Sequence, residues 1–86
     1  MAVKDWSTKD LLLAAFLITK AYKFSNPPKY YNNNTWFYFE DTPALQAVIL
    51  KYYNREVLVN PIDFNSSMRF LHRIMDGLKE GGEKNV

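Results

Sequence analysis

The first long apolar stretch of the chain predicts a buried helix. Eight consecutive apolar residues run from Leu11 to Ile18, and a helix that is apolar on every side is enclosed by other elements. Ser7 is a suitable N-cap, and Asp10 follows three residues later. The pattern therefore predicts a helix from about Thr8 to Ala21.

Two further helices are predicted to start at a capping residue that is followed by proline. The first begins at Asp41-Thr42-Pro43, continues as one apolar stripe and is expected to end at Asn54 in a left-handed conformation. The second begins at Asn60-Pro61 and carries apolar residues on one face over four turns. Gly77 is expected to weaken this last helix, and Gly81-Gly82 to end it.

Between the first and second helices the alternation of side chains predicts an antiparallel hairpin. Residues 35–40 are rich in β-branched and aromatic side chains, which favour strands. Their alternation places two phenylalanines on one face, and Trp36 and Tyr38 on the other. Residues 22–25 are the expected partner strand. Residues 26–34, with two prolines and four asparagines, are expected to form a long loop.

Together these elements predict one small α+β domain over residues 1–80, with 81–86 as a disordered tail. The expected order is helix, β-hairpin, helix, a short strand or extended connector at 57–59, and helix. A chain of 86 residues supports one compact core. That core is expected to contain apolar residues from the three helices and the hairpin: Leu12, Ala15, Phe16, Phe37, Phe39, Leu45, Val48, Ile49, Phe64, Met68, Leu71 and Met75.

Composition excludes several kinds of chemistry. The chain has no cysteine and one histidine, which excludes a disulfide framework, thiolate catalysis and zinc fingers. Its three glycines all follow residue 76, so no glycine-rich phosphate loop or nucleophile elbow is present. The net charge of +2 is a mild bias. We therefore expect a cytoplasmic protein that is not an enzyme and that binds no cofactor or metal.

Three motifs carry a resemblance to a known family. They are Thr8-Lys9-Asp10-Leu11-x-Leu13-Ala14-Ala15-Phe16-Leu17, Phe37-x-Phe39-Glu40-Asp41 and Val57-Leu58-Val59-Asn60-Pro61. Over about residues 7–75 the chain resembles a family of short bacterial and phage open reading frames that is classed only as a domain of unknown function. The family often has a glycine after its first helix, where this chain has Lys20-Ala21-Tyr22, which implies a different turn. The resemblance implies a bacterial or phage origin and no functional residues.

The predicted hairpin combines aromatic and basic side chains, which makes it the first candidate site. Aromatic rings beside cations bind single-stranded nucleic acid, but Tyr and Trp are equally favoured at protein interfaces. If helices cover only one face of the hairpin, the outer rings form a contact surface. If both faces are covered, Trp36 and Tyr38 belong to the core. The candidate residues are Lys23, Lys29, Tyr30, Tyr31, Trp36, Tyr38 and Arg55.

The last helix carries a second basic group. Arg69, His72 and Arg73 follow one another at helical spacing and are suited to phosphate or carboxylate. Asp76 and Glu80 reduce the positive charge of this face, so a solvated helix surface is the simpler interpretation.

These patterns favour a non-catalytic binding module. We expect it to act through protein–protein contact with the outer aromatic face, as an inhibitor or accessory factor, or by self-association as a homodimer. The alternative is a nucleic-acid-binding protein that uses the hairpin together with Arg69 and Arg73. Neither function involves a membrane or a small-molecule cofactor.

Overall fold

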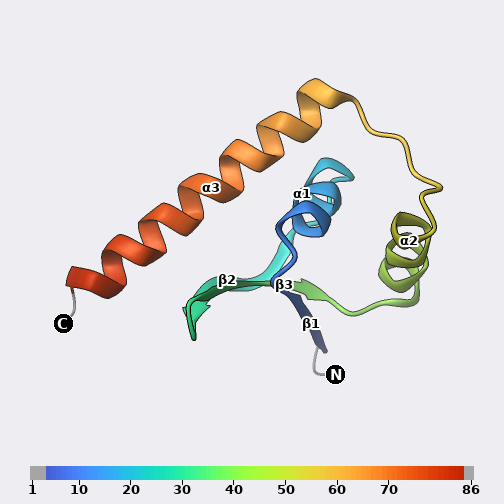
Figure 1. The fold of residues 1–86 in the computed structure, drawn as a ribbon. Helices are drawn as coiled ribbons and strands as arrows, with labels where there is room; N and C mark the ends of the chain where they lie inside the picture. The colour runs from blue at the N-terminus through green and yellow to red at the C-terminus, as the bar shows by residue number, and fades with distance from the viewer. Residues whose placement is uncertain (1–3, 85–86) are drawn as a thin grey trace.

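The chain folds as a small α+β domain, as predicted. A computed structural model describes the backbone of residues 4–84 and the side chains of residues 4–79. Helices α1 and α3 lie over one face of a three-stranded sheet, and α2 stands beside it (Figure 1). The elements are β1 (Asp5–Thr8), α1 (Leu11–Thr19), β2 (Phe24–Tyr31), β3 (Asn34–Glu40), α2 (Pro43–Tyr53) and α3 (Pro61–Lys84).

The sheet contains an N-terminal strand in place of the predicted start of the first helix. All strands are antiparallel in the order β1-β3-β2. Thr8 is buried and pairs with Phe37 of β3, so the prediction that Ser7 caps a helix beginning at Thr8 is wrong. Asp10 is the N-cap instead, and its carboxylate accepts a hydrogen bond of 3.2 Å from the Leu13 backbone N–H. The chain at 57–59 is an extended connector.

The predicted long loop is also wrong, because β2 continues through it. Pro27 and Pro28 lie within β2, where the pairing register with β3 shifts twice. Proline is tolerated here because β2 is an edge strand with one unpaired side and local bulges. The hairpin closes at Asn32 and Asn33, whose φ angles of 51° and 63° are typical of a tight type I′ turn.

Both predicted cap-and-proline starts are confirmed. Thr42 Oγ1 accepts a hydrogen bond from the Leu45 N–H at 3.0 Å, and Asn60 Oδ1 accepts one from the Ile62 N–H at 2.8 Å.

The ends of these two helices differ from prediction. Asn54 ends α2 with φ −82°, and the left-handed residue is Arg55, with φ 60°. Helix α3 continues through Gly77 and Gly81 to Lys84. Residues 85–86 of the predicted tail lie outside the described residues.

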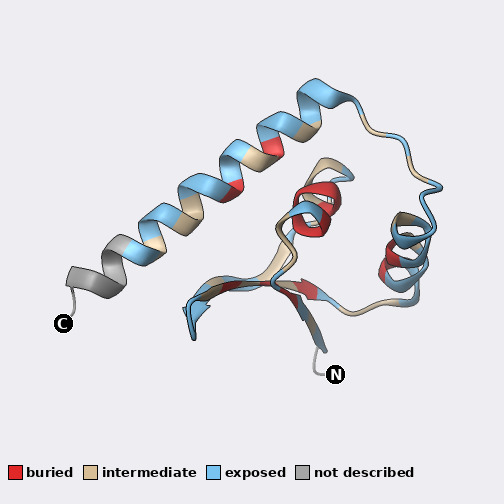
Figure 2. Ribbon diagram, viewed as in Figure 1, coloured by how far each residue is buried: buried red, intermediate tan, exposed pale blue. Residues whose placement is uncertain are grey.

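The core lies where α1 meets the sheet, α2 and α3, and Figure 2 shows buried residues on each of these elements. Leu12 was expected in the core but is 51% exposed. It lies in the first turn of a short helix whose other sides pack on β1 and α3. The other predicted core residues are buried (Ala15, Phe16, Phe37, Phe39, Leu45, Ile49 and Leu71) or partly buried (Val48, Phe64, Met68 and Met75).

The turn after α1 adopts the left-handed conformation although it contains no glycine. Ala21 has φ 71° and donates its N–H to the Ile18 carbonyl at 2.9 Å. A residue with a Cβ is strained in this conformation. The turn therefore has the geometry that a glycine would favour, rather than the different turn expected from the sequence.

We expect Ala21→Gly to raise the free energy of unfolding by about 1 kcal/mol, because it relieves this strain. Thermal and urea unfolding measure the change. The matched control is Ala47→Gly, at an exposed position inside α2, which is expected to lower stability by about 1 kcal/mol. An equal decrease in the free energy of unfolding in both variants would contradict the strained geometry at Ala21.

Candidate functional site

The face of the sheet opposite α1 and α3 is the candidate site. Alternation along β3 points Phe37 and Phe39 toward the helices, where both are buried, and turns Trp36 and Tyr38 the other way, where both are half-buried. This confirms the predicted alternation. Helices α1 and α3 lie over the other face of the sheet (Figure 1). The register assigns the following residues to this outer face: Asp5, Ser7, Asn26, Lys29, Tyr31, Asn34, Trp36, Tyr38 and Glu40.

Two lysines lie against the aromatic rings of the outer face. The Lys29 ammonium is 5.9 Å from the centre of the Tyr38 ring. Lys9, which follows β1, places its ammonium 6.0 Å from the centre of the Trp36 ring. Each contact is a cation–π interaction that contributes about 0.5–1 kcal/mol at an exposed site. Trp36 and Tyr38 therefore each lie beside a positive charge.

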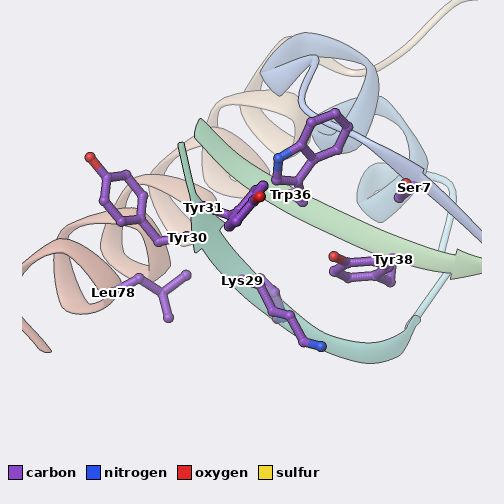
Figure 3. Close-up of a pocket in the computed structure, with 8 residues that line it drawn as sticks. Ser7, Lys29, Tyr30, Tyr31, Trp36, Tyr38 and Leu78 are labelled. Carbon is purple, nitrogen blue, oxygen red and sulfur yellow. The ribbon is translucent and has the colours of Figure 1, made fainter. Parts of the chain in front are cut away.

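An open hollow of about 680 Å³ lies at the turn end of the hairpin. Figure 3 shows Lys29, Tyr31, Trp36 and Tyr38 along the strands, with Tyr30 near α3, the helix that carries Leu78. Tyr30 pairs with the buried Thr35 and so belongs to the inner face. The hollow thus extends from the outer face around the edge of β2, and most of its lining is apolar or aromatic.

The other end of the outer face is acidic. Asp5 and Glu40 are direct cross-strand neighbours, an arrangement that is unfavourable for two carboxylates. The Asp5 carboxylate accepts hydrogen bonds from Ser25, at 2.7 Å, and from Asn26. It therefore reaches over β3 to the β2 side of the sheet. Lys23, just before β2, lines a hollow of about 480 Å³ with both acidic residues.

The structure brings some of the predicted site residues together and separates others. Lys29, Tyr31, Trp36 and Tyr38 share the outer face. Arg55 lies after α2, where it lines a different hollow with Tyr52, Tyr53 and Val57.

Arg69 and Arg73 point away from the sheet. On a helix with 100° per residue, each lies about 160° around the axis from Leu71. Leu71 is fully buried, and both arginines are exposed. Their side chains therefore project from the helical layer, on the opposite side of the domain from the outer face. They do not form one continuous surface with Trp36 and Tyr38.

Several residues of this region, among them Asp5, Ser7, Lys9 and Glu40, were not predicted as site residues. Asp5, Ser7 and Lys9 lie in or next to β1, and its last two residues were predicted as the cap and first residue of a helix. The signal was the alternation of Trp6 and Thr8 with polar neighbours, which is typical of a half-buried strand.

Outside the outer face, the titratable groups give little indication of chemistry. Burial, followed by the charges of Asp10 and Tyr53, raises the pKa of Tyr52. Within the described part of the chain, no three His, Cys, Asp or Glu side chains are grouped to hold a metal ion. None of the helices described there combines the length and apolar character that a membrane span requires.

Comparison with known proteins gives one match. Neither the curated proteins nor the solved structures contain a significant match to the chain. The model of one family, described as a domain of unknown function (DUF5659), matches residues 4–77. This range covers β1, the hairpin, α1, α2 and most of α3. The fold and outer face described above are thus those of a member of DUF5659, the family to which this chain belongs.

Proposed function

We propose that the protein is a non-catalytic binding module that contacts another protein through the outer face of its sheet. The observation that carries this proposal is the contrast between the two faces. Phe37 and Phe39 are buried under the helices, whereas Trp36 and Tyr38 keep part of their rings accessible and Tyr31 is 66% exposed. A row of large rings that the fold leaves uncovered is typical of an interaction surface.

The types of residue on this face suit a protein partner. Tyr and Trp provide large contact areas with few rotatable bonds, and they are enriched among residues that dominate binding energy. Lys9 lies against Trp36 and Lys29 against Tyr38, so both rings are flanked by positive charge. An aromatic side chain also loses little conformational entropy when a partner packs on it.

The charge of the face also favours protein over nucleic acid. Asp5 and Glu40 lie at one end of the face, where they would repel a phosphate backbone that follows the strands. Proteins tolerate mixed charge at an interface because both signs find partners.

Nucleic-acid binding is the second candidate, and it is supported by the two lysines that lie against aromatic rings. Rings for stacking beside cations for phosphate are the elements of a single-strand-binding surface. In this version Lys29, Trp36 and Tyr38 bind the strand. Arg69 and Arg73 do not contribute to the same contact, because they project from the other side of the domain.

The resemblance to short bacterial and phage reading frames supports a cellular role. We propose that the protein acts in the cytoplasm of a bacterium or of a phage-infected cell, as an inhibitor, an accessory factor or a self-associating protein.

Affinity capture from the source cells tests the proposal. Tagged wild-type protein is expected to retain a specific protein, identified by mass spectrometry. The double variant Tyr31→Ala/Tyr38→Ala is expected to recover that protein at least about tenfold less, because it removes two rings from the face. The matched control is Tyr53→Ala, an exposed tyrosine on α2 (60% exposed), which is expected to recover as much as wild type.

A titration with labelled single-stranded and double-stranded oligonucleotides separates the two candidates. Nucleic-acid binding through lysines weakens steeply as salt increases. Saturable binding at low salt that Tyr38→Ala abolishes would contradict the protein-contact proposal. The absence of binding even at low salt would exclude the second candidate.

A further inference from the structure

We propose that the occupant of the outer face is a second copy of this chain, in a symmetric dimer whose sheets pack face to face with antiparallel strands. The inference rests on the proposed function, because it names the protein that the face contacts. It goes further by committing to one partner and one orientation.

Charge on the outer face is arranged about Tyr38. Lys29 is paired with Trp36, two residues to one side of Tyr38 along β3, and Asp5 is paired with Glu40, two residues to the other side. Lys9 adds a second positive charge at the Trp36 end. The face is therefore basic at one end, acidic at the other and aromatic between them.

This arrangement complements itself when the strands of two copies run in opposite directions. The twofold axis lies between the two sheets, passes near Tyr38 and runs perpendicular to the strands. It brings the basic end of each copy over the acidic end of the other. A symmetric dimer uses the same patch on both subunits, so it requires this self-complementarity. A partner of different sequence only has to match this face with its own surface. Its binding would not require opposite charges at equal distances on the two sides of Tyr38.

The position of the Asp5 carboxylate supports the pairing. Its hydrogen bonds with Ser25 and Asn26 hold it on the β2 side of the sheet. In the proposed dimer β2 of one copy lies over β2 of the other, so this carboxylate lies on the same side as Lys29 of the second copy. Lys9 follows β1, so it lies over the β1 side of the partner's acidic end. Lys23 places one positive charge at the acidic end, where the two carboxylates still give a net negative charge.

The size of the face indicates a reversible dimer. Three strands at ordinary spacing are about 14 Å across, and an eight-residue β2 is about 26 Å long. The resulting footprint is about 360 Å² per subunit, roughly half that of a standard specific interface, and complexes with contacts this small are weak and transient. We expect dissociation in the micromolar range and a marked dependence on salt, because charges on both ends of a small exposed interface are screened.

Sedimentation equilibrium with charge-reversal variants tests the dimer and its orientation. Wild-type protein is expected to follow a monomer–dimer equilibrium that weakens as salt increases. The Lys9→Glu/Lys29→Glu and Glu40→Lys variants are each expected to weaken dimerisation at least about tenfold, because symmetry applies each change twice. The combined variant Lys9→Glu/Lys29→Glu/Glu40→Lys, in which an acidic end faces a basic end again, is expected to return to within about threefold of wild type.

Mixing the Lys9→Glu/Lys29→Glu variant with the Glu40→Lys variant provides an independent readout. The Lys9→Glu/Lys29→Glu chain is acidic at both ends and the Glu40→Lys chain is basic at both ends, so an equimolar mixture is expected to form a heterodimer while each variant alone remains monomeric. The matched control is Arg73→Glu, an exposed charge reversal on α3, which is expected to leave dimerisation unchanged. All of the reversed positions are exposed, and circular dichroism verifies that each variant is folded.

Several outcomes would overturn the inference. A wild-type monomer at all concentrations, a dimer that is insensitive to salt, or variants reversed at one end that dimerise as well as wild type would each do so. If the protein is a monomer but loses a captured protein with Tyr31→Ala/Tyr38→Ala, self-association fails and the proposed function stands. If it is a monomer whose outer face binds oligonucleotides, both fail.

Discussion

Phe37→Ala is expected to remove most of the stability of the domain. The Phe37 side chain is 1% exposed in the central strand and stacks on Phe24, with ring centres 5.9 Å apart. Replacing a buried phenylalanine by alanine costs about 3–5 kcal/mol, because it removes apolar contacts and leaves a cavity. A domain of this size is stable by about 4–13 kcal/mol in total. Urea denaturation at 25 °C is therefore expected to show a large fall in the midpoint or a protein that is already unfolded.

The neighbouring Tyr38→Ala variant is the control for this prediction. Tyr38 is half-buried on the other face of the same strand and contacts Lys29. Its replacement is expected to cost about 1 kcal/mol, since only part of the side chain is buried and it lies on the face away from the core. Similar losses in the two variants would show that the outer face is packed like a second core, and they would contradict the proposed contact surface.

The starts of α2 and α3 were predictable from sequence because the interactions that define them are local. Thr42 and Asn60 each accept a hydrogen bond from a backbone N–H two or three residues later. The proline that follows each of them already has a φ angle suited to the first turn. Neither interaction depends on the rest of the fold.

Strand β1, and the part of β2 beyond the predicted residues 22–25, were not predictable, because their conformation depends on partners distant in sequence. Residues 5–8 form a strand only because β3 supplies hydrogen bonds some thirty residues later in the chain. Pro27 and Pro28 fit β2 only because that strand lies at the edge of the sheet. Local turn chemistry therefore predicted a loop where the tertiary structure has a bulged strand.

The candidate site shows the same division. Alternation within residues 35–40 was sufficient to predict that Trp36 and Tyr38 share a face. The acidic end of that face depends on the register between β1 and β3, and the direction of Arg69 and Arg73 depends on which side of α3 packs on α1. Both are properties of packing between elements, so the sequence led to a basic surface where the structure has a face with charges of both signs.

Leu45→Ala is expected to release α2 from the domain while the sheet, α1 and α3 stay folded. Leu45 and Ile49 are the buried residues of α2, and Leu45 is fully buried. Its truncation costs about 2–5 kcal/mol. An isolated helix of 11 residues is marginal in water, so α2 that loses its anchor is expected to unfold locally. Hydrogen exchange measured by NMR is expected to show loss of protection in α2 with protection retained in β3 and α1.

The control is Leu50→Ala, on the same helix but 62% exposed, which is expected to change stability by less than about 0.5 kcal/mol. Equal loss of protection in all elements of Leu45→Ala would contradict local release and would show that α2 unfolds together with the core. Local release of α2 is also expected to leave the outer face intact. Because the outer face is built by β1, β2 and β3, Leu45→Ala is expected to retain salt-dependent dimerisation, whereas Phe37→Ala loses it together with the fold.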